Sequence, residues 1–145
     1  MRVRLAAIAA LWLGLTGPVA IAGGIDDATG RHVELPDRIE RVLPAGPPAS
    51  VLLFTLAPDK MLGWAHKPGA AAAPFLGAAA ELPETGPIAP HGEPDLDRIR
   101  ALKPDLILDI GTVSPRYADM AKRVQEATGI PYILLDGSLD ATAAT

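Results

Sequence analysis

The sequence contains no cysteine among its 145 residues. A disulfide framework, a thiolate metal site and a lipid-bearing cysteine behind a leader are therefore excluded. It also lacks the glycine-rich dinucleotide and phosphate loops, the nucleophile elbow and the zinc-protease histidine motif. We therefore expect a protein that is not an enzyme. A secreted α/β enzyme with an acid/base group at Asp109 or Asp136 is an alternative, although a hydrogen-bonding role suits Asp109 better.

Apolar runs of membrane-spanning length are missing as well. The run Leu5–Leu15 is shorter than the roughly 18 residues that a spanning helix needs. It follows two arginines and precedes an Ala-Ile-Ala site, which is the pattern of a cleaved secretory signal peptide. We expect residues 1–22 to be removed before Gly23, which places the remainder in the periplasm without a membrane anchor.

Positive charge is scarce. Thirteen lysines and arginines stand against 17 aspartates and glutamates, so the formal charge is −4, and removal of residues 1–22 with their two arginines brings it to −6. An acidic chain is a poor nucleic-acid binder, and we expect no nucleic-acid partner. The remaining 123 residues suffice for one domain with a hydrophobic core, expected to be a monomer.

The spacing of apolar residues predicts an α/β lobe. We expect a hairpin over 25–35, strands at 39–45, 61–65, 106–110 and 131–135, and helices at 49–56, 95–103 and 115–128. A surface connection with one short helix at 74–81 is expected over 66–93. This order predicts a Rossmann-like lobe with a mostly parallel sheet flanked by helices and an N-terminal hairpin.

Three segments resemble one family of transport proteins. They are IDDATGRHVELP (25–36), PDLDRIRALKPDLILDIG (94–111) and TGIPYILLDG (128–137). They are similar to periplasmic proteins that deliver iron-siderophores, haem or cobalamin to ABC importers, in which two lobes joined by a long helix hold the ligand between them. The resemblance implies that 23–145 is the N-terminal lobe, with linker helix and second lobe absent.

The same resemblance implies a function. The chain would be the solute-binding component of an ABC importer that captures a metal chelate, iron-siderophore first and cobalamin or haem next, and delivers it to the permease. Docking on the permease would use Asp97, where the family usually has glutamate. A carboxylate in the first turn of a helix is also favoured by the macrodipole, so a structural role explains Asp97 equally well.

Ligand contacts are expected where the strands end, because ligands of open α/β sheets gather at the carboxyl edge. The candidates in the following loops are Gly46, Pro47, His66, Lys67, His91, Gly111, Arg116 and Tyr117. Imidazoles suit a metal or its chelate, and Arg116 suits an anion. A histidine in a loop is more often solvated than bound to a ligand, and Tyr117 could pack on the sheet. No histidine pair has helical metal-site spacing, which favours a chelate over a bare ion.

A third class of function stays open. A lone lobe could act only as an interaction module that contacts a permease or receptor and holds no ligand.

The absence of a tyrosine in 86–91, where haem-binding relatives often have one, makes haem the weaker choice of cargo.

Overall fold

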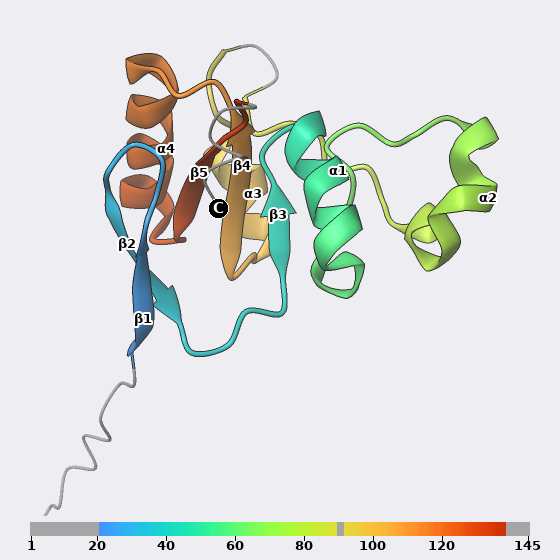
Figure 1. The fold of residues 1–145 in the computed structure, drawn as a ribbon, viewed down its shortest axis with the longest axis horizontal. Helices are drawn as coiled ribbons and strands as arrows, with labels where there is room; N and C mark the ends of the chain where they lie inside the picture. Colours follow the sequence, from blue (N-terminus) through green and yellow to red (C-terminus); the bar gives the residue numbers. More distant parts are fainter. Residues whose placement is uncertain (1–20, 90–91, 139–145) are drawn as a thin grey trace, which may run out of the picture.

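The computed structural model describes residues 21–89 and 92–138 (Figure 1). The strands are β1 (Ile21–Asp26), β2 (His32–Pro36), β3 (Val42–Pro44), β4 (Leu106–Gly111) and β5 (Tyr132–Asp136). The helices are α1 (Pro47–Leu56), α2 (Ala73–Leu76), α3 (Leu96–Leu102) and α4 (Pro115–Thr128), with 3-10 turns η1 (Pro58–Lys60), η2 (Ala70–Ala72) and η3 (Gly77–Glu81). No helix in this part of the chain is long and apolar enough to cross a bilayer.

The central sheet has three strands in the order β3-β4-β5, and both pairings are parallel. Val42 lies opposite Leu106, and Ile107 lies opposite Tyr132. A parallel ladder needs a long crossover between neighbouring strands, and here the crossovers carry the helices. The predicted α/β lobe with a mostly parallel sheet and an N-terminal hairpin is confirmed.

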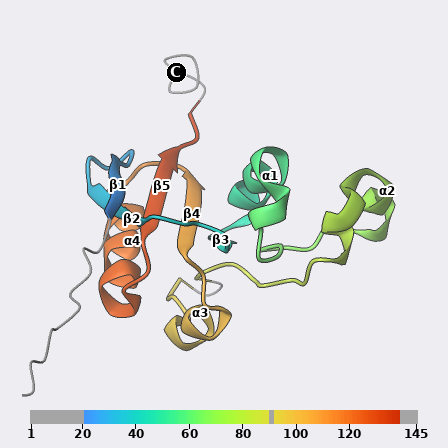
Figure 2. The same ribbon diagram turned by 90° about the horizontal axis from the view of Figure 1, so that it is seen from below.

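The side chains of adjacent residues in each strand are buried on opposite faces of this sheet, because successive strand side chains point to alternate faces. One core contains Val42, Leu106 and Ile133 with the inner side of α1. The other contains Leu43, Ile107 and Tyr132 with residues of α3 and α4. Figure 2 shows α1 and α3 on opposite sides of the strands. Runs of consecutive apolar residues are therefore needed in these strands, as in other parallel sheets.

Local signals end α3 and α4 where the sequence predicts. Asp95 caps α3 by accepting a hydrogen bond from the Arg98 N–H, and Lys103 ends the helix in the left-handed region. Gly129 follows α4 with a φ of 72°, a conformation that glycine adopts without steric cost. Ser114 occupies the N-cap position of α4, but its side chain makes no capping hydrogen bond.

The strand predicted at 61–65 is wrong. Met61 and Trp64 form only isolated bridges, to Val42 and Glu84 respectively. Gly63 packs against the Pro83 carbonyl so tightly that a side chain there would collide with it. The segment thus turns from the edge of β3 to a different partner within four residues, and no ladder can form. Trp64 is nevertheless in the core, only 2% exposed.

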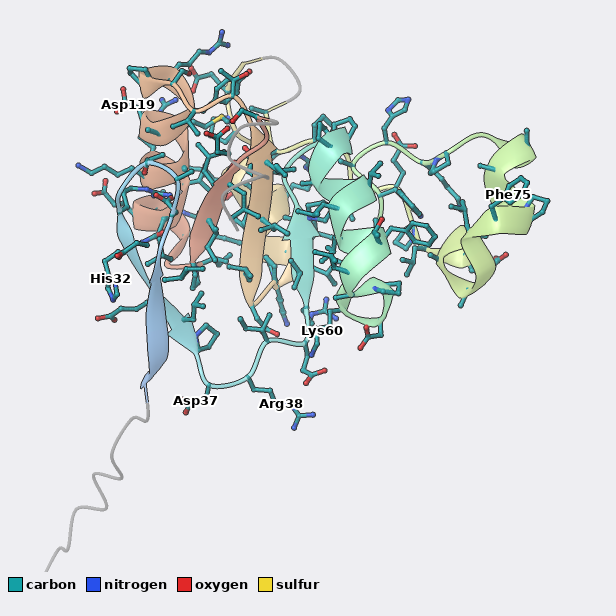
Figure 3. The ribbon with its side chains drawn as sticks, viewed as in Figure 1. His32, Asp37, Arg38, Lys60, Phe75 and Asp119 are labelled. Atoms are coloured by element: carbon teal, nitrogen blue, oxygen red, sulfur yellow. The ribbon has the colours of Figure 1, made fainter. Side chains whose placement is uncertain are left out.

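The connection 66–93 is less superficial than predicted. Its helical turns begin at Ala70, where the sequence predicts a helix only from 74. Ala79 is buried and its carbonyl accepts a hydrogen bond from the Trp64 indole at 2.8 Å. Phe75 is 83% exposed and points away from the sheet (Figure 3). The return segment is also buried at Ile88, which is 2% exposed.

The hairpin is fastened to the sheet through Asp27. This carboxylate is buried and accepts hydrogen bonds from the backbone N–H groups of Thr29 and Arg31 and from the Thr29 hydroxyl. It also pairs with the Arg31 guanidinium, which in turn donates to the Tyr132 carbonyl at 2.9 Å. The Ala28 N–H donates to the Leu134 carbonyl at 2.9 Å. The turn therefore joins the edge of β5.

We expect Asp27→Asn to lower the free energy of unfolding at neutral pH by about 1–3 kcal/mol, because buried donors lose an ionised acceptor. Burial raises the pKa of Asp27, but the hydrogen bonds from Thr29 and Arg31 outweigh it and the pKa lies below its usual value. The carboxylate therefore stabilises the fold above the pKa of an unfolded aspartate. That contribution is lost as pH falls through the lowered folded pKa.

Urea unfolding at a series of pH values measures this effect. The matched control is Asp26→Asn, because the Asp26 side chain is 77% exposed and hydrogen-bonds only to His32 in the described chain. Equal losses of stability in the two variants would contradict the role assigned to Asp27.

Candidate ligand-binding cleft

An open cleft of about 350 Å³ lies at the carboxyl ends of β3, β4 and β5. All three strands run toward the same edge of the sheet, the upper edge in Figure 1, where α4 also begins. The volume of the cleft is within the range of roughly 300–1,000 Å³ that small-molecule pockets occupy. Parallel strands thus deliver their following loops to one place, as the sequence predicts.

Small residues form much of the cleft wall. Gly46 and Pro48 follow β3, while Gly111 is the last residue of β4 and Thr112 follows it. The Gly137 N–H donates to the Gly111 carbonyl at 2.9 Å, and the two glycines approach so closely that a side chain at 137 would crowd the Gly111 backbone. Backbone atoms are therefore more accessible at this edge than bulky side chains would allow.

A second wall comes from the segment 87–89 of the long connection. The Ile88 N–H donates to the Ala45 carbonyl at 2.8 Å, which fastens the segment to the end of β3. The guanidinium of Arg98 in α3 donates to the carbonyls of Thr85 and Pro87. This wall is consequently held by the sheet on one side and by α3 on the other.

The polar side chains of the cleft come from β4, β5 and α4. Arg116 and Tyr117 belong to the first turn of α4, and Tyr117 is 41% exposed. Asp109 and the fully buried Tyr132 line the cleft from neighbouring strands. Tyr132 lies opposite Ile107, so the residue two positions further along β4, Asp109, is on the same face within reach of its hydroxyl.

Asp109 and Tyr132 form a buried polar pair. The Tyr132 hydroxyl donates to Asp109 Oδ2 at 2.9 Å, and the Ile110 N–H donates to Asp109 Oδ1 at 2.9 Å. Burial raises the pKa of Asp109, and these hydrogen bonds offset only part of the shift. Burial and the neighbouring Asp109 also raise the pKa of Tyr132, so its proton stays in place. The hydrogen-bonding role expected for Asp109 is confirmed.

The structure brings together half of the residues predicted to contact a ligand. Gly46, Gly111, Arg116 and Tyr117 all line the cleft. Pro47 is exposed beside it, at the start of α1, but is not part of the lining. The Tyr117 side chain lines the cleft and is 41% exposed.

Of the remaining predicted contacts, two lie outside the cleft lining and one lies outside the described residues. His66 and Lys67 are exposed and lie outside the cleft lining, and His66 Nδ1 is 3.5 Å from a carboxylate oxygen of Glu84. His91 lies outside the described residues, next to Gly92 of the lining. The segment 61–65 does not join the sheet as a strand, and neither His66 nor Lys67, which follow it, lines the cleft.

Two lining residues had no signal in the sequence. Tyr132 reads as an ordinary core residue of a buried strand, and only its position opposite β4 turns its hydroxyl toward Asp109. Ile88 lies in a Gly- and Pro-rich connection that shows no periodicity. The hydrogen bond from Ile88 to β3 that draws it in depends on tertiary contacts.

Asp97 lies away from the cleft lining, in the first turn of α3. Its side chain is 98% exposed and accepts a hydrogen bond from Arg100 at 3.1 Å. The carboxylate is thus accessible to a partner. Among residues 21–89 and 92–138, no group of three or more His, Asp or Glu side chains is arranged to hold a metal ion.

The sequence matches no family model and no curated protein, whereas the structure matches solved transport proteins. A solute-binding protein of an ABC transporter from Sulfurospirillum deleyianum has a TM-score of 0.63 at 21% identity, over 80% of this chain and 37% of that one. The molybdate periplasmic binding protein MolA of Haemophilus influenzae has a TM-score of 0.57 at 19% identity, over 78% and 34%. A variant of the haem-binding protein HmuT gives 0.52 at 19% identity, over 82% and 36%.

The chain has the fold of an ABC transporter solute-binding protein. Identities near 20% show this fold and nothing finer. The chain spans about a third of the length of the three proteins. All three are named as binding proteins.

We expect Asp109→Asn to gain stability relative to the unsubstituted protein as pH rises toward neutral. Asparagine keeps an oxygen acceptor for the Tyr132 hydroxyl and carries no charge to bury, whereas its amide nitrogen cannot accept from the Ile110 N–H, a loss that is the same at every pH. The raised pKa of Asp109 means that ionisation costs the folded state. The unsubstituted protein should therefore lose stability relative to the variant as pH rises from the unfolded pKa through the raised folded pKa.

Chemical unfolding of both proteins across that pH range gives the difference directly. In acid, where aspartic acid is neutral in both the folded and the unfolded chain, only the lost acceptor for the Ile110 N–H should separate the two proteins in stability. A variant that is less stable by the same amount at every pH would contradict a charge effect and indicate lost packing.

Proposed function

We propose that this chain is a solute-binding lobe of an ABC importer that captures a metal chelate, a ferric siderophore first and cobalamin or haem next, and delivers it to the permease. The observation that carries the proposal is the cleft at the carboxyl edge of a sheet whose fold is that of solute-binding proteins. The lining combines apolar surface, accessible backbone and few polar groups, as small-molecule sites usually do.

Export to the periplasm is part of the proposal. The predicted signal peptide, 1–22, lies almost wholly outside the described residues. Cleavage before Gly23 would leave the pairings Gly24 with Glu34, Ile25 with Val33 and Asp26 with His32 in place. The hairpin that docks on β5 therefore remains after the leader is removed.

The ligand would contact the cleft through Gly46, Gly111, Arg116 and Tyr117. The Arg116 guanidinium is a donor for an anionic or carbonyl oxygen, and the accessible Tyr117 ring offers an apolar face. Pro47, His66, Lys67 and His91 remain proposed contacts. Similar structures include proteins named for molybdate and for haem, which supports metal-containing cargo as a class.

The partner of the loaded lobe would be the importer permease, which the lobe would meet through Asp97. Exposure of this carboxylate at the start of α3 supports the assignment. Arg98, the next residue, holds the cleft wall at 85–87, so a contact made at Asp97 lies one residue from a group that shapes the cleft.

A second function is favoured by one observation. The Asp97 carboxylate is exposed and away from the cleft lining, so the chain could serve as an interaction module that contacts the permease and carries no ligand. Binding of a chelate by the protein isolated from its host decides between the two.

We expect the intact mass of the protein isolated from the periplasm of its host to be that of a chain that begins at Gly23. Calorimetric titration of that protein with a ferric siderophore, cobalamin and haem should show saturable binding of at least one of them. A periplasmic protein that binds none of the three would support the interaction module instead. Retention of residues 1–22 would contradict export by a cleaved leader.

We expect Asp97→Asn to raise, by about three- to tenfold, the concentration of binding protein that half-maximally stimulates the importer ATPase in proteoliposomes. Loss of one charged contact in an interface accounts for a change of this size. The control is Asp119→Asn, which removes an exposed carboxylate from α4 (Figure 3). Equal responses of the two variants would indicate a general charge effect and contradict docking at Asp97.

A further inference from the structure

Two charged side chains line the described part of the cleft, Asp109 from β4 and Arg116 from α4. Neither of them forms an ion pair with another described residue. The charge of this lining is therefore balanced, with one carboxylate and one guanidinium, although the whole chain is acidic. A ligand in the cleft would meet both groups.

Asp109 retains acceptor capacity toward the cleft. A carboxylate offers about four lone-pair positions. Two of these receive the Tyr132 hydroxyl and the Ile110 N–H, each at 2.9 Å. Free acceptor positions in a partly buried carboxylate are costly unless a donor meets them, because water is only partly available there.

Tyr132 cannot turn to supply a donor to the ligand. Its ring is fully buried, its N–H donates to the Gln125 side chain at 3.1 Å and its carbonyl accepts from Arg31 at 2.9 Å. Its single hydroxyl proton is committed to Asp109. The polar pair therefore presents acceptors to the cleft and holds them rigidly.

We propose that Asp109 is a specificity-determining residue, whose carboxylate accepts hydrogen bonds from the ligand and makes the cleft prefer neutral or cationic chelates to multiply anionic ones. This inference rests on the proposed function and names the charge class of its ligand. A multiply anionic ligand near the pair would be repelled by the carboxylate, and Arg116 offsets only one of its charges. In a partly desolvated site, such a repulsion is stronger than in water. An oxyanion without protons offers Asp109 no donor at all.

The test uses the protein at full length, as isolated, and two probes. The ferric complex of desferrioxamine B is cationic and carries N–H donors, and the ferric complex of enterobactin is multiply anionic. We expect the unsubstituted protein to bind the cationic complex more tightly. Asp109→Asn should strengthen binding of the anionic complex by about tenfold, the effect of roughly one screened charge contact, and should weaken or leave unchanged binding of the cationic one.

The matched control is Asp119→Asn, which makes the same change in net charge on α4 outside this cleft and should alter neither affinity. The inference is overturned if the anionic complex binds the unsubstituted protein more tightly, or if Asp109→Asn shifts both affinities equally or neither. If both complexes fail to bind both proteins, the proposed chelate-binding function fails first and this inference falls with it. The circular dichroism spectrum of each variant should match that of the unsubstituted protein, which establishes that the compared proteins are folded.

Discussion

The structure depends on the alternation of side chains across a three-stranded parallel sheet. Within β3, β4 and β5, neighbouring residues such as Val42 and Leu43 are buried in separate cores. Each strand must therefore be apolar at successive positions, and helices must cover both faces. Once this condition is met, all three strands end at one edge, and the position of the cleft follows without any further specification.

The carboxyl edge of the sheet is also where polar side chains occupy positions that are apolar further inside the strands. Asp109 continues the same face as Ile107, but it lies near the end of β4 where the core gives way to the cleft. Its hydrogen bond to Tyr132 lets a carboxylate remain close to the core with its oxygens partly satisfied. A polar pair in this position costs some stability, because burial disfavours the charge, and it gives the cleft a fixed acceptor.

A second buried carboxylate, Asp27, acts where the hairpin turn meets β5. Its hydrogen bonds organise the hairpin turn, and Arg31 extends them to the carbonyl of Tyr132. The hairpin is thus connected through β5 to the residue that holds Asp109. Asp27 is ionised more readily than an ordinary aspartate and Asp109 less readily, because donors surround the first while burial dominates for the second.

Regular elements were predictable wherever periodicity and end signals coincide. The helix capped by Asp95 and the helix closed by Gly129 have the expected ends, since capping uses residues adjacent in sequence. The strand predicted at 61–65 failed because a short apolar run indicates burial but not a pairing partner. Gly46, Gly111, Arg116 and Tyr117 were predictable cleft residues, as each follows a correctly predicted strand.

The sequence by itself therefore determined β3, β4, β5, α1, α3, α4 and the loops that meet at the cleft, because hydrophobic spacing and capping are local properties. Only the tertiary structure decided which side chains share the cleft. The pairing register set Tyr132 against Asp109, and a hydrogen bond to β3 brought Ile88 into the wall. His66 lies outside the lining, and the segment before it forms only isolated bridges. These outcomes depend on contacts between residues distant in sequence, which a local pattern does not encode.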